Sequence, residues 1–102
     1  MDDAKTVVEI ELDGRPLTLT PTPEAIIGVS DAFDGLAPAM AAISRLSVKA
    51  MTVVINAGAG LKGDDAKGTA KAVASSNLVD LSGKLTDFVA SLCNGGRPFK
   101  AG

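Results

Sequence analysis

The chain has 102 residues, of which 46% are hydrophobic and only 3% aromatic, and ten basic against twelve acidic residues give a net charge of −2. This length is that of one domain, the apolar content is too high for a disordered chain, and the even spread of charge leaves no basic stripe for nucleic acid. No apolar run approaches the roughly 20 residues that cross a bilayer, so no membrane-spanning helix is expected. The acidic start lacks the pattern of a signal peptide, so no signal peptide is expected either. The single cysteine, Cys93, excludes an internal disulfide and suits a reducing cytosol.

Residues 6–20, with the sequence TVVEIELDGRPLTLT, predict a β-hairpin. Apolar and polar residues alternate along both halves, which is the period of a strand with one buried face. Asp13-Gly14 is a strong signal for a two-residue type I′ turn, because both positions of that turn need positive φ. That turn sets a register in which the predicted pairs are Leu12 with Arg15, Ile10 with Leu17 and Val8 with Leu19. A lone hairpin is marginal in water, so its apolar face must lie on helices.

Helical segments follow the hairpin. They are predicted at about residues 23–34, 36–45, 48–60, 64–75 and 78–94. Thr22, Ser47 and Asn77 are good N-caps for the first, the third and the last of these helices. Gly28 lies inside the first helix, where it either costs about 1 kcal/mol against alanine or marks a close crossing with another element.

The segment RLSVKAMTVVINAGAGLK, residues 45–62, is open to two interpretations. Its run Thr52–Ile55 has the composition of a buried strand. Ser47 before this run and the glycines at 58 and 60 after it are instead typical of helix ends. A helix is favoured, because apolar side chains recur at helical spacing along one face. That face is formed by Val48, Met51, Thr52, Ile55 and Ala59.

These elements predict an α+β fold, with an N-terminal β-hairpin packed on a bundle of four to five short helices. The order of elements contains no βαβ alternation, so no parallel sheet is expected. One domain is predicted over residues 6–94, between a disordered N-terminus at 1–5 and a flexible C-terminal tail at 95–102.

Residues that carry enzyme chemistry are sparse. Histidine is absent, which removes the commonest general base and the usual zinc ligand. Asp64-Asp65 is the only internal acidic pair, and its place at a predicted helix start is explained by the helix dipole. The sequence GAGLKG at 58–63 lacks the lysine and hydroxyl ending of a P-loop and fits a helix C-cap followed by a loop. Glu9 and Glu11 could hold a cation, but two solvated carboxylates are the simpler interpretation. No catalytic residue, cofactor or metal site is predicted.

Apolar surface is then the main candidate for function. The chain holds more small apolar residues than a minimal core needs, and methionine side chains adapt to varied partners. Exposed apolar positions on the middle helices are predicted to bind a partner. The candidates are Met40, Ile43, Met51 and Val54. The hairpin offers a second surface: Pro16 blunts the edge of the second strand by removing a donor, whereas residues 6–12 could pair with a second copy or with a partner peptide.

The sequence VEIELDGRPLTLTPTPEAIIGVSDAFDGLAPAMAAISRLSVKAMTVVINAGAGL, residues 8–61, resembles a small phage protein family that also occurs in gene transfer agents of alphaproteobacteria. Members of that family open with a hairpin of alternating apolar residues around a Gly-Arg or Gly-Lys pair, followed by helices. The family lies among tail genes and is labelled a tail tube protein or a tail assembly chaperone. The resemblance covers most of residues 7–94, and it departs from the family at GLKGDD and at the final RPFKAG.

The resemblance implies a non-enzymatic tail assembly chaperone that acts in the cytoplasm of a bacterial host. Its expected partners are the tape-measure protein, a very long helical chain, and tail-tube subunits. A long amphipathic chain would aggregate through its apolar stripe, and a small protein with its own groove can cover that stripe transiently. Self-association into a homo-oligomer stays open, and no cofactor, nucleic acid or membrane is expected. The alternatives are a structural subunit of the tail tube and a small regulatory protein-binding module.

Overall fold

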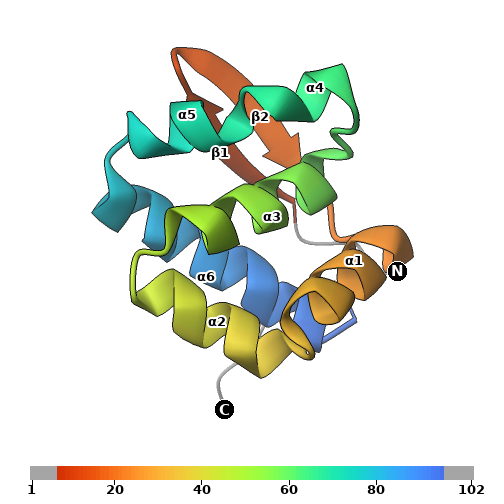
Figure 1. Cartoon of the computed structure of the whole chain (residues 1–102). Coiled ribbons are helices and arrows are strands. Elements are labelled where there is room, and N and C mark those ends of the chain that lie inside the picture. The colour runs from red at the N-terminus through yellow and green to blue at the C-terminus, as the bar shows by residue number, and fades with distance from the viewer. Residues whose placement is uncertain (1–6, 96–102) are drawn as a thin grey trace.

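The computed structural model describes residues 7–95 (Figure 1). The predictions of a disordered N-terminus at 1–5 and a flexible tail at 95–102 therefore fall outside the described residues, apart from Gly95. The elements in chain order are β1 (Val8–Leu12), β2 (Arg15–Leu19), α1 (Pro23–Phe33), α2 (Leu36–Ser44), α3 (Val48–Ala59), α4 (Asp64–Lys67), α5 (Thr69–Ala74) and α6 (Leu78–Cys93). This order confirms the predicted α+β fold, a β-hairpin followed by a helical bundle.

The hairpin forms because local chemistry specifies both its turn and its register. Asp13 and Gly14 take φ values of 55° and 77°, as a type I′ turn requires. The strands are antiparallel, and the observed pairs are Val8 with Leu19, Glu9 with Thr18, Ile10 with Leu17, Glu11 with Pro16 and Leu12 with Arg15. This is the predicted register. It turns the apolar side chains of both strands toward the helices, where Leu12 and Leu19 are buried.

Helix α3 lies at the centre of the molecule (Figure 1). It contacts β2, α1, α2, α5 and α6. Ser47 caps its first turn by accepting a hydrogen bond from the backbone N–H of Ala50, and Gly60 ends it in the left-handed conformation. The interpretation of residues 52–55 as helix is confirmed. A central helix has little solvent-facing surface, so more of the circumference of α3 is buried than the apolar face predicted from the sequence. The buried residues of α3 are Ala50, Met51, Val54, Ile55 and Gly58.

The core forms where the hairpin, α3 and α6 meet. Its largest fully buried side chains come from all three, and they include Leu19, Met51, Ile55, Leu85 and Phe88. Three phenylalanines are the only aromatic residues in the chain, so most of the filling comes from aliphatic groups. Backbone segments also come close together in this core.

Gly58 is the position where that close approach is tightest. A Cβ atom built there would lie 2.9 Å from Cζ of Phe88 and 3.1 Å from Cβ of Leu19. The backbone carbonyl of Gly58 also accepts a hydrogen bond of 2.9 Å from the N–H of Thr20. Helix α3 therefore docks on β2 and α6 through a residue without a side chain. At Gly28, by contrast, an added Cβ would meet only Cβ of Ala57 at 3.9 Å, an ordinary van der Waals contact, so the packing of α1 on α3 there does not require a glycine.

The predicted helix at residues 64–75 is broken in two. Gly68 separates α4 from α5, and its backbone stays near the right-handed helical region with φ −88° and ψ −2°. Helix α4 buries no residue, whereas α5 buries Thr69 and Val73. Glycine is a poor helix former, and only the second segment gains tertiary contacts that hold it in place. The break at Gly68 follows from this difference.

Among the described residues no single helix is both long and apolar enough to cross a lipid bilayer. Helices α1 and α2 satisfy that test only when taken together, and they are bent by 73° at the break between them.

Candidate functional site

The four predicted partner-binding side chains do not form a surface. Ile43, Met51 and Val54 are each 0% exposed, and Met40 is half-buried against the core. The prediction that these apolar positions are exposed is therefore wrong for three of the four. Met51 and Val54 lie on the central helix α3, whose apolar face meets other elements on several sides, and Ile43 lies on α2, which packs against α6, α1 and α3. A partner could reach these three side chains only by opening the core.

The large apolar side chains that do reach solvent lie elsewhere. They are Val7, Ile27, Leu46 and Val79. Ile27 is 61% exposed and Val79 is 67% exposed. Ile27 follows Ile26 and Val79 follows Leu78, and in each helix the second residue lies outside the apolar face that packs on the core. The exposure of these two side chains could therefore be predicted from the helical spacing. Val7 precedes β1 and Leu46 lies between α2 and α3, whereas Ile27 and Val79 lie on α1 and α6. None of the four lines either of the grooves described below.

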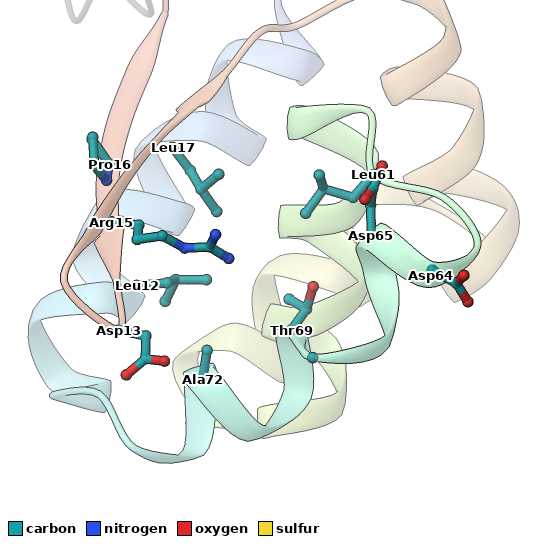
Figure 2. Close-up of a pocket in the computed structure, with 11 residues that line it drawn as sticks. Leu12, Asp13, Arg15, Pro16, Leu17, Leu61, Asp64, Asp65, Thr69 and Ala72 are labelled. Carbon is teal, nitrogen blue, oxygen red and sulfur yellow. The ribbon is translucent and has the colours of Figure 1, made fainter.

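A groove lies between the hairpin and the segment that contains α4 and α5 (Figure 2). Its volume is about 530 Å³, within the range of about 300–1,000 Å³ that is common for binding pockets. The hairpin side is lined by Leu12, Asp13, Arg15, Pro16 and Leu17, and the opposite side by Leu61, Asp64, Asp65, Gly68, Thr69 and Ala72. We call this hollow the hairpin groove. Its lining mixes an apolar floor with charged groups.

Arg15 is the one basic side chain in the lining of the hairpin groove. It lies on the inward-facing side of β2, opposite Leu12, and its guanidinium extends over the groove between Leu12 and Leu17 (Figure 2). Within residues 7–95 it forms no ion pair, although Asp64 and Asp65 lie on the far wall. Asp64 instead pairs with Lys67 at 3.0 Å, a contact at the surface. The five donors of the guanidinium are therefore available to a ligand.

The far wall of the hairpin groove is anchored at one end only. The hydroxyl of Thr69 donates a hydrogen bond of 2.7 Å to the side-chain oxygen of Asn56, which ties α5 to α3. Val73 is fully buried and adds to that attachment. Helix α4 has neither a buried residue nor a side-chain hydrogen bond to another helix within the described part of the chain. The α4 end of this wall is thus held by fewer contacts than β2, which is paired in the sheet.

A smaller groove of about 220 Å³ runs between β1 and α6. Its lining consists of Ile10, Glu11, Ser76, Asn77, Asp80, Leu81 and Lys84. Ile10 and Leu81 are its buried apolar members. We call it the β1 groove, because it follows the edge of β1 that is not paired with β2.

The motifs weighed for chemistry have structural roles. Gly60 is the left-handed C-cap of α3, and its N–H donates to the carbonyl of Asn56, so the prediction for GAGLKG as a C-cap is confirmed. Asp64 and Asp65 stand in the first turn of α4 and are exposed. Within residues 7–95 no three acidic or cysteine side chains gather closely enough to hold a metal ion. Cys93 is exposed at the end of α6.

Comparisons of this chain with protein-family models, with curated proteins and with solved structures find no match. The resemblance to the phage tail family therefore stays a prediction. Among the described residues, the hairpin groove is the main candidate for a binding site.

Proposed function

We propose that this chain is a non-catalytic tail assembly chaperone of a phage or a gene transfer agent, working in the cytoplasm of the bacterial host. In this proposal it holds a segment of the tape-measure protein, or of a tail-tube subunit, in the hairpin groove. The observation that carries the proposal is the lining of that groove, where apolar side chains lie beside a guanidinium that forms no ion pair within residues 7–95. The resemblance over residues 8–61 supplies the identity of the partner.

The hairpin groove suits an apolar partner segment that places one carboxylate at Arg15, away from Asp64 and Asp65 on the far wall. Leu17 and Leu61 are only partly buried and offer apolar surface to the partner's hydrophobic side chains. Covering that surface releases free energy in proportion to the area removed from water. Arg15 then selects among apolar segments, because its fork of donors matches a carboxylate in a bidentate geometry. A helix of the tape-measure protein with an acidic residue beside its apolar stripe meets both conditions.

The size of the groove suits transient binding. A hollow of about 530 Å³ covers only a few side chains of a partner, so each chaperone shields a short stretch and a long chain needs many copies. Small interfaces of this kind are typical of weak, short-lived complexes. An assembly chaperone needs that property, since tube subunits must displace it as they polymerise.

Co-expression with a tape-measure fragment tests the proposal. We expect this chain to raise the soluble fraction of the fragment, and Arg15→Glu to reduce that gain. Hydrogen bonds to charged groups contribute about 1.5–3 kcal/mol, so the affinity of the purified fragment, measured by titration calorimetry, should fall about tenfold or more.

The matched control is Arg45→Glu, which makes the same charge change at an exposed position outside the groove. Leu61→Asp provides a second variant that places a charge on the apolar floor. No gain in solubility with the unmodified chain, or equal losses for Arg15→Glu and Arg45→Glu, would count against the proposal.

A structural subunit of the tail tube is the alternative, and the unpaired edge of β1 is the feature that favours it. A two-stranded sheet has few strands for closing a ring. Electron microscopy of the purified protein separates the two functions: rings or tubes formed by the chain alone would support the structural subunit and overturn the chaperone.

A further inference from the structure

The outer edge of β1 presents backbone groups that nothing in the described chain satisfies. In a hairpin with a two-residue turn the residues that flank the turn form a hydrogen-bonded pair, and such pairs alternate along the strands. Leu12 with Arg15 is that first pair, so Val8, Ile10 and Leu12 bond to β2. Glu9 and Glu11 therefore direct their N–H and C=O groups away from β2. No hydrogen bond from elsewhere in residues 7–95 reaches these groups.

The space beside this edge is open. The β1 groove follows it, with Ile10 and Leu81 on its floor, Ser76 and Asn77 just before α6, and Lys84 on α6. An added strand lies about 4.8 Å from its neighbour, which places it over this groove. A side chain opposite Ile10 would then point inward against Leu81, whereas side chains opposite Glu9 and Glu11 would point outward.

Charge decides which strand fits. Glu9 and Glu11 are exposed on the outer face of β1, and Asp80 lies across the groove, against the single base Lys84. A second copy of β1 added antiparallel would set glutamate opposite glutamate at both positions, and like charges directly opposite one another are destabilising. A strand with lysine or arginine at those two positions gains two opposite-charge pairs instead.

We propose that the outer edge of β1 is a strand-addition site for an extended segment of a partner protein with the pattern basic, apolar, basic. Backbone hydrogen bonds to Glu9 and Glu11 supply the attachment, and the two carboxylates with the Ile10–Leu81 floor supply the selection. This site lies on the opposite edge of the sheet from the hairpin groove. It is independent of the chaperone function and gives the protein a second attachment point.

A titration of the full chain with short peptides, followed by NMR of the backbone amides, tests the proposal. The probe is an acetylated and amidated pentapeptide, Lys-Val-Lys-Val-Lys, and the control peptide is Glu-Val-Glu-Val-Glu. We expect the lysine peptide to shift the amide signals of Glu9 and Glu11 and to slow their hydrogen exchange. It should bind at least about tenfold more tightly than the glutamate peptide, because two favourable pairs become two repulsive ones.

Two sets of variants separate backbone pairing from simple charge attraction. Glu9→Pro removes one outward donor, a substitution that an edge strand tolerates, and it should reduce binding of the lysine peptide. Thr18→Pro is the matched control, since it removes an outward donor from β2 at the position that faces Glu9. The Glu9→Lys, Glu11→Lys double variant should reverse the preference and bind the glutamate peptide. Arg15→Glu should leave peptide binding unchanged, which distinguishes this site from the hairpin groove.

The proposal does not depend on the folding of any variant. A lysine peptide N-methylated at the residues that face Glu9 and Glu11 keeps its charge but loses the backbone donors, and it should fail to bind the unmodified chain. Equal binding of the methylated and unmethylated peptides would overturn the proposal. So would shifts that avoid Glu9 and Glu11, or a concentration-dependent dimer in sedimentation that Glu9→Pro abolishes, because that dimer would assign the edge to a second copy.

Discussion

At the scale of single residues, Gly58 has tighter surroundings than the other glycines within residues 14–83. Its missing side chain lets α3 approach Leu19 of β2 and Phe88 of α6. Both neighbours are fully buried, so neither can move aside without displacing other core groups. Nothing in the local sequence distinguishes Gly58 from Gly60, which merely ends the helix. The distinction arises from two elements that are distant along the chain.

Gly58→Ala should destabilise the protein, and Gly83→Ala should stabilise it. Both substitutions gain up to about 1 kcal/mol of helix propensity. An added Cβ at Gly83 meets nothing within 4 Å, whereas overpacking at Gly58 costs about 1–3 kcal/mol. The difference between the two free energies of unfolding, from chemical denaturation, isolates that cost. Two variants of equal stability would show that the contact at Gly58 relaxes freely.

Arg15 illustrates what residue-level patterning can and cannot predict. Its pairing with Leu12, and hence its place on the inward-facing side of the hairpin, follows from the alternation and the turn. Its role in the hairpin groove does not, because the other wall comes from residues 61–72. Arg15 is exposed, so water solvates its guanidinium in the free protein, and no described side chain forms an ion pair with it.

At the scale of elements, helix ends are specified locally. Asn77 accepts hydrogen bonds from the backbone N–H groups of Val79 and Asp80 at 3.1 Å each. Thr22 and Ser47 cap α1 and α3 in the same manner, through the N–H groups of Ala25 and Ala50. All three caps are predicted from residue type alone, because capping depends only on groups within three positions in the chain.

Asn77→Ala should lower the stability of the whole domain. The loss of an N-cap side chain costs about 1 kcal/mol, which lowers the melting temperature of a domain of this size by about 4–8 °C. Thermal unfolding followed by circular dichroism measures the change. Asn77→Asp keeps an acceptor at the cap and should melt close to the unmodified chain. A similar loss in both variants would show that the amide group, and not the capping oxygen, is what matters.

Segments held by tertiary contacts are predicted less well than those held by local ones. The segment 64–75 is predicted as one helix despite Gly68 in its interior, yet only α5 gains an anchor, through Thr69 and Val73. Helix α4 is left as one short turn between Gly63 and Gly68. Isolated helices of this length are unstable in water, so the helix breaks at the residue with the lowest propensity.

At the scale of the whole molecule, local stability should follow the arrangement of elements around α3. We expect backbone amides of α3 and α6 to exchange with solvent only on global unfolding, because both helices contribute to the shared core. Amides of α4 should exchange fastest among the helices of the described chain, since α4 buries nothing. Native-state hydrogen exchange measured by NMR provides the comparison.

This pattern bears on binding, because α4 forms part of one wall of the hairpin groove. A mobile wall can adapt to different stretches of a partner chain, and protection of α4 should rise when the groove is filled. Protection of α4 equal to that of α3 in the free protein would show a rigid groove and would remove this source of adaptability.

Local rules account for the α+β order, the type I′ turn, the strand register and the three N-caps. Each depends on residues within a few positions of one another, so the printed sequence already contains the interacting groups. Burial follows a different rule. From the sequence alone, apolar residues such as Ile43, Met51 and Val54 could belong either to an exposed docking surface or to the core. They belong to the core because other elements cover α2 and α3. The same holds for three features of the tertiary structure: the hairpin groove, the tight docking at Gly58 and the outer edge of β1. Each depends on how segments far apart in the chain come together, because packing is a property of two surfaces and not of either one alone.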